Sequence, residues 1–535
     1  MSLKPQPPRP MPAEVARLAH LLPAESPYRL VGDVVYEQYD EADFVDLYHV
    51  EGRPGVSPVD LSFVTAFQVL ENLSDRQAAE AVRLRVDVKY ALHLPLDYAG
   101  FDFSVLSEFR DRVIRHGAEA RLFDAVLAQL QALGVFKQRG RQRTDSLAVL
   151  TKVRNLNRIE MVVETLRVAL QALLKADGNW TRATVPPTWE EVYGERCITA
   201  KLTQAERHAL AERVGPDGQW LLERLRAETA PAGLSTLPAV QLLATVWQQQ
   251  FETLEGRVVL RDRDDADGHT RIVTPHDPDA RYSKKGEQQW VGDKLQVTET
   301  DDEDRPHLIT DIAVTASVET DYEALDGIQR RLEQRGLEPA QPYADAGYVT
   351  EANLAHSAGR EIDLVGPVKK DTSRQARMPG GITLEQFDVD AEAGVAICPA
   401  GQQARASTRR GKRFIFRFRS AVCAACPLRP RCCTGHGGRH LSLGRHYQLL
   451  RAARARQESE ALQADYHHHR SGIEGCLSAL VRGHGVRIAR YIGRAKRHLH
   501  ALFTAAAVNL RRAARWLAGK RPQVRRQGLG LVPTT

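Results

Sequence analysis

The feature that most limits the fold is an alternation of strand-like and helix-like patterns between Trp290 and Val368. β-rich runs flank a turn-like stretch at 301–305, which predicts a hairpin, and capping residues at Thr320 open a helix that Gly336 ends. The predicted order is strand 290–298, strand 308–316, helix 320–335, a strand ending at Asp345, helix 350–357 and strand 361–365. A hairpin followed by strand–helix–strand connections predicts an α/β fold with a mixed sheet.

Three acidic residues stand at notable places in these patterns. An extended stretch, 138–149, predicts a further strand with Asp145 near its end, so Asp145 and Asp345 are expected at one edge of the same sheet. Tyr466, Arg470 and Glu474 follow at i, i+4 and i+8, which places them on one face of a predicted helix. Taken alone, Glu474 could equally form an ordinary ion pair with Arg470.

Charge is strongly segregated along the chain. Residues 404–535 carry 28 Lys or Arg against 4 Asp or Glu, whereas residues 1–403 carry 46 against 63. Glu474 is the last acidic residue. Segregation on this scale indicates a polyanionic partner, most simply nucleic acid. A solvated basic tail would account for residues 519–535 alone.

Bulk properties set the class of protein. With 535 residues and 43% apolar content the chain can bury several cores in about three domains. No apolar run approaches a membrane span and the first residues lack a signal-peptide core, so we expect a cytoplasmic protein that does not contact a membrane. Disulfides are then not expected.

Five of the seven cysteines lie between Cys398 and Cys433. A tetrahedral zinc site is one interpretation and reduced thiols packed in a small insertion are the other. The zinc ligands would be Cys398, Cys423, Cys426 and Cys432, with Cys433 or His436 as substitutes.

Short capped helices dominate the chain up to about Phe136. They fit either a helix-turn-helix reader of DNA, with Arg76 and Arg83 among its contacts, or a plain helical bundle with a polar face. Two other polar runs are expected to be solvated: the acidic loop at 262–267, and the histidines at 467–469 as an exposed helix turn near DNA.

Taken together, these residues resemble the DDE transposases of bacterial insertion sequences, over nearly the whole chain. The resemblance is carried by the following motifs: Thr144-Asp145-Ser146 with the run 153–160, Tyr343-Ala-Asp345-Ala-Gly-Tyr348, the set Tyr466, Arg470, Glu474 and Lys496, and the Cys-x-x-Cys-Pro-Leu-Arg insertion. The order D, D, E along the chain is the order that the RNase H-like core of that family uses.

The resemblance implies an RNase H-like α/β core with a mixed five-stranded sheet and flanking helices, an all-α N-terminal DNA-binding domain and a helical insertion. The expected boundaries are the N-terminal domain at 1–135, the first core strand at 136–150, the helical insertion at 151–264, the core with Asp345 at 265–374, the Cys-containing insertion at 375–450, the C-terminal core helices with Glu474 at 451–518 and the basic tail at 519–535.

The resemblance also implies a reaction. Asp145, Asp345 and Glu474 would hold two Mg²⁺ or Mn²⁺ ions over a phosphodiester, because these hard cations prefer oxygen ligands. The enzyme would cut double-stranded DNA at the inverted-repeat ends of its element and join the ends to target DNA, as a homodimer. Contacts to DNA phosphates would come from Tyr466, Arg470, Lys496, Arg482 and Arg490.

The chain departs from the family pattern at three places. Asp145 and Asp345 lie 200 residues apart, so the helices between them are expected to be an insertion. Three residues separate Tyr466 from Arg470 where related transposases commonly have two, and Lys496 lies beyond the usual spacing. These departures weaken the roles of Tyr466 and Lys496 but leave the three acids unaffected.

Two alternatives remain open on the sequence. His467, Arg470 and Tyr491 faintly resemble the arrangement of a tyrosine recombinase, which would use a phosphotyrosyl intermediate and no metal. The chain could also be a catalytically inert DNA-binding protein derived from a transposase. Convergence of the three acidic side chains would favour the DDE enzyme over both.

Overall fold

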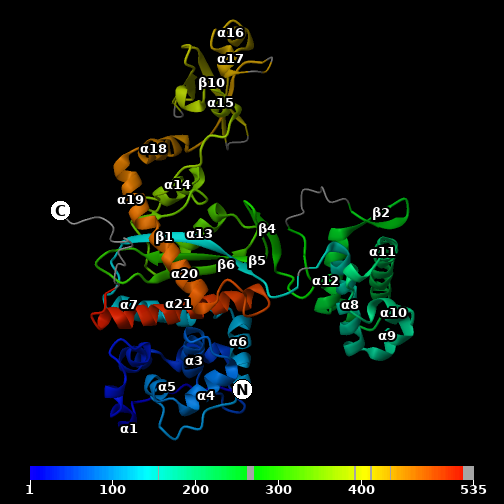
Figure 1. The fold of residues 1–535 in the computed structure, drawn as a ribbon, viewed down its shortest axis with the longest axis vertical. Coiled ribbons are helices and arrows are strands. Elements are labelled where there is room, and N and C mark those ends of the chain that lie inside the picture. The colour runs from blue at the N-terminus through cyan, green and yellow to red at the C-terminus, as the bar shows by residue number, and fades with distance from the viewer. Residues whose placement is uncertain are drawn as a thin grey trace, which may run out of the picture.

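The computed structural model describes residues 1–521 except 155, 262–269, 391–392, 410–412, 434 and 436. The acidic loop at 262–267, His436 and nearly all of the basic tail therefore lie outside the described residues. A central sheet is flanked by N-terminal helices on one side and a β-rich lobe on the other, with a helical lobe beside it (Figure 1). Among the described helices, none is long and apolar enough to cross a membrane.

The central sheet is mixed, as predicted. β5 (Gln288–Thr300) pairs antiparallel with β1 (Arg141–Leu150), with β6 (Ile309–Ala316) and, through its first residues, with β4 (Arg281–Lys285). β1 pairs in parallel with β7 (Gln341–Tyr343), and Tyr343 forms a parallel bridge to Val365. The hairpin prediction is confirmed, whereas the strand predicted at 361–365 is reduced to this single bridge.

Buried ion pairs hold the helices on the sheet. α13 (Asp321–Gln334) begins with the predicted capping box at Thr320 and ends before Gly336. Arg331 and Arg335 both bind Asp311 of β6, whose side chain is fully buried. Removing one partner of such a pair would leave an uncompensated buried charge, so the pairs fix the position of the helix. α14 (Glu351–Ala358) follows β7, as predicted.

α21 (Arg494–Leu517) joins the core to the N-terminal helices. It packs against β6 on one side and against α3 and α7 on the other, so it lies between the sheet and the N-terminal helices (Figure 1). Asn509 exchanges two hydrogen bonds with the backbone of Ile309, at 2.8 and 2.7 Å. The longer N-terminal helices are α3 (Pro58–Leu70), α4 (Asp75–Leu84), α5 (Val86–Ala91), α6 (Ser104–Arg115) and α7 (Arg121–Ala132).

The segment after β1 forms a lobe with its own core. Its buried residues, such as Leu166, Trp189 and Leu243, make a cluster separate from that of the sheet. Gly218 is required there, because a Cβ at this position would lie 2.0 Å from the Trp247 ring. The elements are α8 (Arg158–Ala176), α9 (Gly178–Thr184), α10 (Trp189–Tyr193), α11 (Gln204–Arg226), α12 (Pro238–Gln250) and the hairpin β2 (Phe251–Leu254) and β3 (Arg257–Leu260).

The cysteine-containing segment is a second lobe, built on a five-stranded antiparallel sheet with a small core around Phe387 and Phe416. Its strands are β8 (Asp388–Asp390), β9 (Val395–Ile397), β10 (Gln403–Arg409), β11 (Arg413–Arg417) and β12 (His440–Gly444). Short helices α15 (Arg374–Arg377), α16 (Ser420–Ala424) and α17 (Arg429–Cys432) complete it.

The chain returns to the core through α18 (Tyr447–Gln457), α19 (Glu460–Arg470) and α20 (Gly472–His484). We expected α19 and α20 to be one helix, but a single turn residue, Ser471, separates them, with right-handed helical dihedrals of −60° and −30°. A Cβ on Gly472 would lie 1.8 Å from the Arg143 guanidinium, so glycine is needed where β1 approaches the helix. The common face of Tyr466, Arg470 and Glu474 stays a prediction.

Candidate active site

Strand register brings Asp145 and Asp345 together. Arg143 of β1 pairs with Tyr343 of β7 in parallel register. Asp145 follows Arg143 by two residues, and Asp345 follows Tyr343 by two residues. We predicted Asp145 near the end of its strand, but it lies in the middle of β1. It stands two residues beyond Arg143, the last residue that pairs with β7. The two carboxylates are close enough that the charge of Asp345 raises the pKa of Asp145.

Asp145 is nearly buried and has a cationic partner. Its Oδ2 atom accepts a hydrogen bond from Nη2 of Arg470 at 2.7 Å, and its Oδ1 atom accepts one from the Ser146 backbone N–H at 2.8 Å. Burial raises the pKa of Asp145, Arg470 opposes this change, and Asp345 adds to it. Arg470 thus compensates for negative charge concentrated at the edge of the sheet.

Tyr466 belongs to the same group. Burial raises the pKa of its hydroxyl, Arg470 lowers it, and the charges of Asp345 and Asp145 raise it further. A phenol beside two carboxylates and a guanidinium can donate a hydrogen bond to an anionic group placed between them.

A fourth acid, Asp321, joins the two aspartates, and the sequence analysis missed it. Its carboxylate accepts a hydrogen bond from Ser146 Oγ at 3.0 Å and lies 3.4 Å from Lys294 Nζ. A Cβ on Gly347 would lie 2.8 Å from Asp345 and 3.1 Å from Asp321. We call Asp145, Asp321 and Asp345 the carboxylate site. The capping sequence at Thr320 predicts only the start of a helix, and it carries no signal for the contact between Asp321 and Ser146.

Glu474 lies on the neighbouring part of the same surface. It is exposed on α20 and lines a cleft of about 490 Å³, here called the Glu474 cleft. Four cations, Lys285, Lys294, Arg482 and Arg487, line the cleft with Ser146. Ser146 and Lys294, which both contact Asp321 of the carboxylate site, thus also line the Glu474 cleft. Within the described parts of the chain, no three His, Cys, Asp or Glu side chains are gathered as they would be around a metal ion.

The other predicted phosphate contacts are dispersed. Lys496 forms an ion pair with Asp111 of α6 at 2.8 Å, and Arg490 donates to the backbone carbonyl of Leu73, so both connect the core to the N-terminal helices. Arg76 stacks on Phe103, 4.7 Å from the ring centre, and Arg83 lies 4.0 Å from Glu80.

The histidine run is only partly exposed. His469 is buried, donates a hydrogen bond from Nδ1 to the Asp301 carboxylate at 2.7 Å, and packs its ring against that of Tyr343, with 4.8 Å between ring centres. The prediction of a fully exposed turn is wrong for this residue, because the helical period places it against the sheet. His469 thus helps to hold α19 against β7, the strand that precedes Asp345.

The cysteines of the second lobe gather around a small cavity of about 30 Å³. Cys398, Cys423, Cys426, Cys432 and Cys433 all line it, and none forms a disulfide. Burial raises the pKa of the Cys432 thiol, and the charges of Cys433, Cys423 and Cys398 would raise it further. All five thiols thus line one cavity, but among the described residues no three of them are placed so that they could hold a metal ion.

Two family models match separate parts of the chain. Residues 397–514 match the model "Transposase DDE domain", which includes the segment from Tyr466 to Lys496, and residues 16–112 match "Transposase domain (DUF772)". These two matches indicate a DDE transposase of an insertion-sequence type. Searches of curated proteins and of solved structures found no match.

Proposed function

We propose that this transposase cuts the inverted-repeat ends of its element and joins them to target DNA by metal-dependent phosphoryl transfer. The carrying observation is the parallel register of β1 and β7, which places Asp145 beside Asp345 at the edge of a mixed sheet. An RNase H-like core uses two strands to deliver two carboxylates in this way, so we assign that core to the sheet with α13 and α19–α21.

The residues present fit a divalent cation of the Mg²⁺ type. Asp145 and Asp345 are hard oxygen donors, and their mutual repulsion is offset by one guanidinium, that of Arg470. Asp145, Asp345 and Glu474 would hold the ions, which would activate the attacking oxygen and stabilise the leaving one. Asp321 would keep Ser146 and Lys294 in place through the contacts described above.

The remaining steps belong to the side chains around the acids. Arg470 would exchange Asp145 for a DNA phosphate, because a guanidinium binds either group with the same fork of donors. Lys285, Lys294, Arg482 and Arg487 would hold the backbone along the Glu474 cleft. DNA binding by the N-terminal helices, pairing of two ends by a homodimer and the domain boundaries given above are part of the same proposal.

The environment of Tyr491 does not favour a tyrosine recombinase. The ring lies against Arg110 and Arg490, 5.3 and 5.8 Å from their guanidinium carbons, between the core and the N-terminal helices. Arg470 instead binds Asp145. A nucleophilic tyrosine would need to lie open to DNA beside the arginine that activates the phosphate.

Cleavage of a duplex that carries the inverted repeat distinguishes the two mechanisms. We expect Asp145→Asn to abolish Mg²⁺-dependent cutting and Tyr491→Phe to leave it within about twofold, since Tyr491 would touch no reacting atom. Loss of cutting in Tyr491→Phe, with cutting retained in Asp145→Asn, would refute the DDE mechanism.

A further inference from the structure

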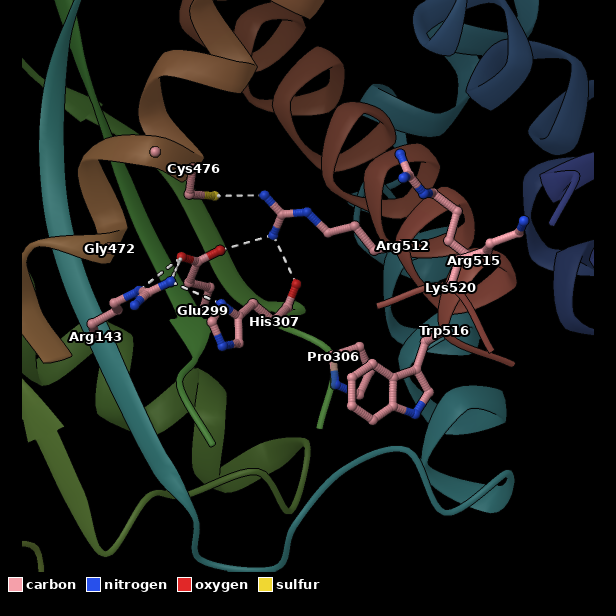
Figure 2. A pocket seen from close by; sticks show the side chains of 11 residues that line it. Arg143, Glu299, Pro306, His307, Gly472, Cys476, Arg512, Arg515, Trp516 and Lys520 are labelled. Carbon is pink, nitrogen blue, oxygen red and sulfur yellow. Dashed lines mark hydrogen bonds and ion pairs between the residues drawn. The ribbon is translucent and has the colours of Figure 1, made fainter. Parts of the chain in front are cut away.

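A second cavity lies on the other side of α20. Gly472, Gly475 and Cys476 of α20 line it, whereas Glu474, Leu477 and Ser478 of the same helix line the Glu474 cleft. Its volume is about 450 Å³, within the range of about 300–1,000 Å³ that is usual for ligand sites. We call it the α20–α21 pocket (Figure 2).

The inner part of the pocket is electrically balanced. Arg143 and Arg512 both bind the buried Glu299, each at 2.8 Å, and Arg143 also binds Asp301 at 2.5 Å. Arg512 further contacts the Cys476 thiol at 3.4 Å. Figure 2 shows Arg143, Glu299, Cys476 and Arg512 converging at one end of the pocket. Because two cations face two carboxylates, this end of the pocket does not itself need an anion.

The mouth of the pocket has charge without compensation. Arg515 and Lys520 are exposed, and no carboxylate in the described part of the chain forms an ion pair with either of them. No Asp or Glu follows Glu474 in the sequence, so none from the C-terminal side can neutralise them. Arg521 adds a third cation, stacked on Trp516 at 3.6 Å. Trp516 and Pro306 supply an apolar wall beside these charges.

Gly475 is a position from which the pocket can be filled. A Cβ built on Gly475 would meet no atom within 4 Å, so a side chain there has room to extend along the pocket that this residue lines. Gly475 has ordinary helical geometry, and leucine has a higher helix propensity than glycine. Replacing this glycine by leucine therefore occupies part of the cavity without straining the helix.

We propose that the α20–α21 pocket binds a backbone phosphate of DNA, with Arg515 and Lys520 holding the phosphate and the sugar packed against Trp516 and Pro306. This proposal rests on the proposed function and deepens it: DNA would contact both sides of α20, at the catalytic acids on one side and at a sequence-independent anchor on the other. Arg143 links the two sides, because it lies two residues before Asp145 on β1 and lines the pocket.

The test is binding of a random-sequence duplex that lacks the inverted repeat, in EDTA, measured over a series of salt concentrations. Arg515→Ala and Lys520→Ala should each make the slope of log affinity against log salt shallower by about 0.9, the value for one lost phosphate contact. The charge control is Arg226→Ala, which removes an exposed arginine from the end of α11 and should leave the slope unchanged.

Gly475→Leu tests the cavity itself without changing charge. Filling the pocket should weaken binding by about threefold to tenfold, whereas Gly483→Leu, at an exposed position of α20 where a Cβ also meets no atom within 4 Å, should bind like the wild type. If Gly475→Leu binds DNA as tightly as the wild type, the proposal is overturned, even if the charge variants bind DNA more weakly. The cations would then act outside the pocket.

The binding test of the pocket can fail independently of the proposed function, because that function is measured by Mg²⁺-dependent cutting of inverted-repeat DNA. Cutting by the wild type together with unaltered binding by all the pocket variants would refute the pocket alone. Salt-dependent binding that Gly475→Leu weakens, without any cutting, would refute the nuclease and retain the pocket.

Discussion

At the scale of single residues, the main feature is the contact between Arg470 and Asp145. Both side chains are about seven-eighths buried, and Asp345 places a second negative charge beside the pair. At a buried position, an ionised carboxylate without a cationic partner lowers the stability of the fold. The low dielectric strengthens its repulsion by the second carboxylate, and burial keeps water from solvating it. Arg470 therefore stabilises the apo state of the same group that the proposed reaction uses.

Arg470→Ala should consequently destabilise the fold at neutral pH by about 3 kcal/mol, the low end for breaking a buried ion pair. The burial that raises the pKa of Asp145 would then be unopposed, so the loss should shrink as the pH is lowered and the carboxyl becomes protonated. Urea unfolding at pH 7 and pH 5 measures both effects, with the exposed Arg451→Ala as control. Equal losses at the two pH values would argue against this electrostatic account.

At the scale of elements, local patterns determined most of what could be predicted. The β5–β6 hairpin, α13 and α14 follow from alternation, caps and glycines that lie within each segment. The break between α19 and α20 lies beside Arg143, and Asp321 contacts Ser146; both partners come from far earlier in the chain. Lys496 likewise meets Asp111 only through tertiary packing. A single sequence carries no direct signal for such pairs.

α21 should make the fold sensitive to acid. Burial lowers the pKa of His498 to about 4, and its Nδ1 atom accepts a hydrogen bond from the Val314 N–H at 3.2 Å. The unfolded chain binds this proton near pH 6.5 and the folded chain does not, so stability is present above pH 6.5 and falls as the pH drops toward 4. We expect a loss of about 1.4 kcal/mol per pH unit from this histidine.

His498→Gln, which can keep the acceptor, should flatten the stability profile between pH 6.5 and 4. The exposed His208→Gln on α11 is the matched control and should reproduce the wild-type profile. Thermal or urea unfolding across this pH range provides the measurement. An unchanged profile in His498→Gln would show that other groups cause the acid sensitivity.

At the scale of the whole molecule, two lobes with separate cores are attached to one core of sheet and helices. Leu243 is fully buried in the helical lobe, and Leu502 is buried in α21. Leu243→Ala and Leu502→Ala should each cost about 2–5 kcal/mol, but in different cooperative units. Hydrogen exchange should accelerate within 158–260 for the first variant and in β5, β6 and α3 for the second. Uniform acceleration in both would contradict the division.

The measurement that tests the central claim most directly is the rate of strand cutting at the inverted repeat, in Mg²⁺, for three conservative variants. Asp145→Asn, Asp345→Asn and Glu474→Gln keep the shape of the side chain and each remove the negative charge of one proposed metal ligand. We predict that each lowers the rate by at least about a thousandfold while duplex binding in EDTA is retained. Cutting at the wild-type rate by any one of the three would contradict the assignment of that residue, and cutting by all three would contradict the mechanism.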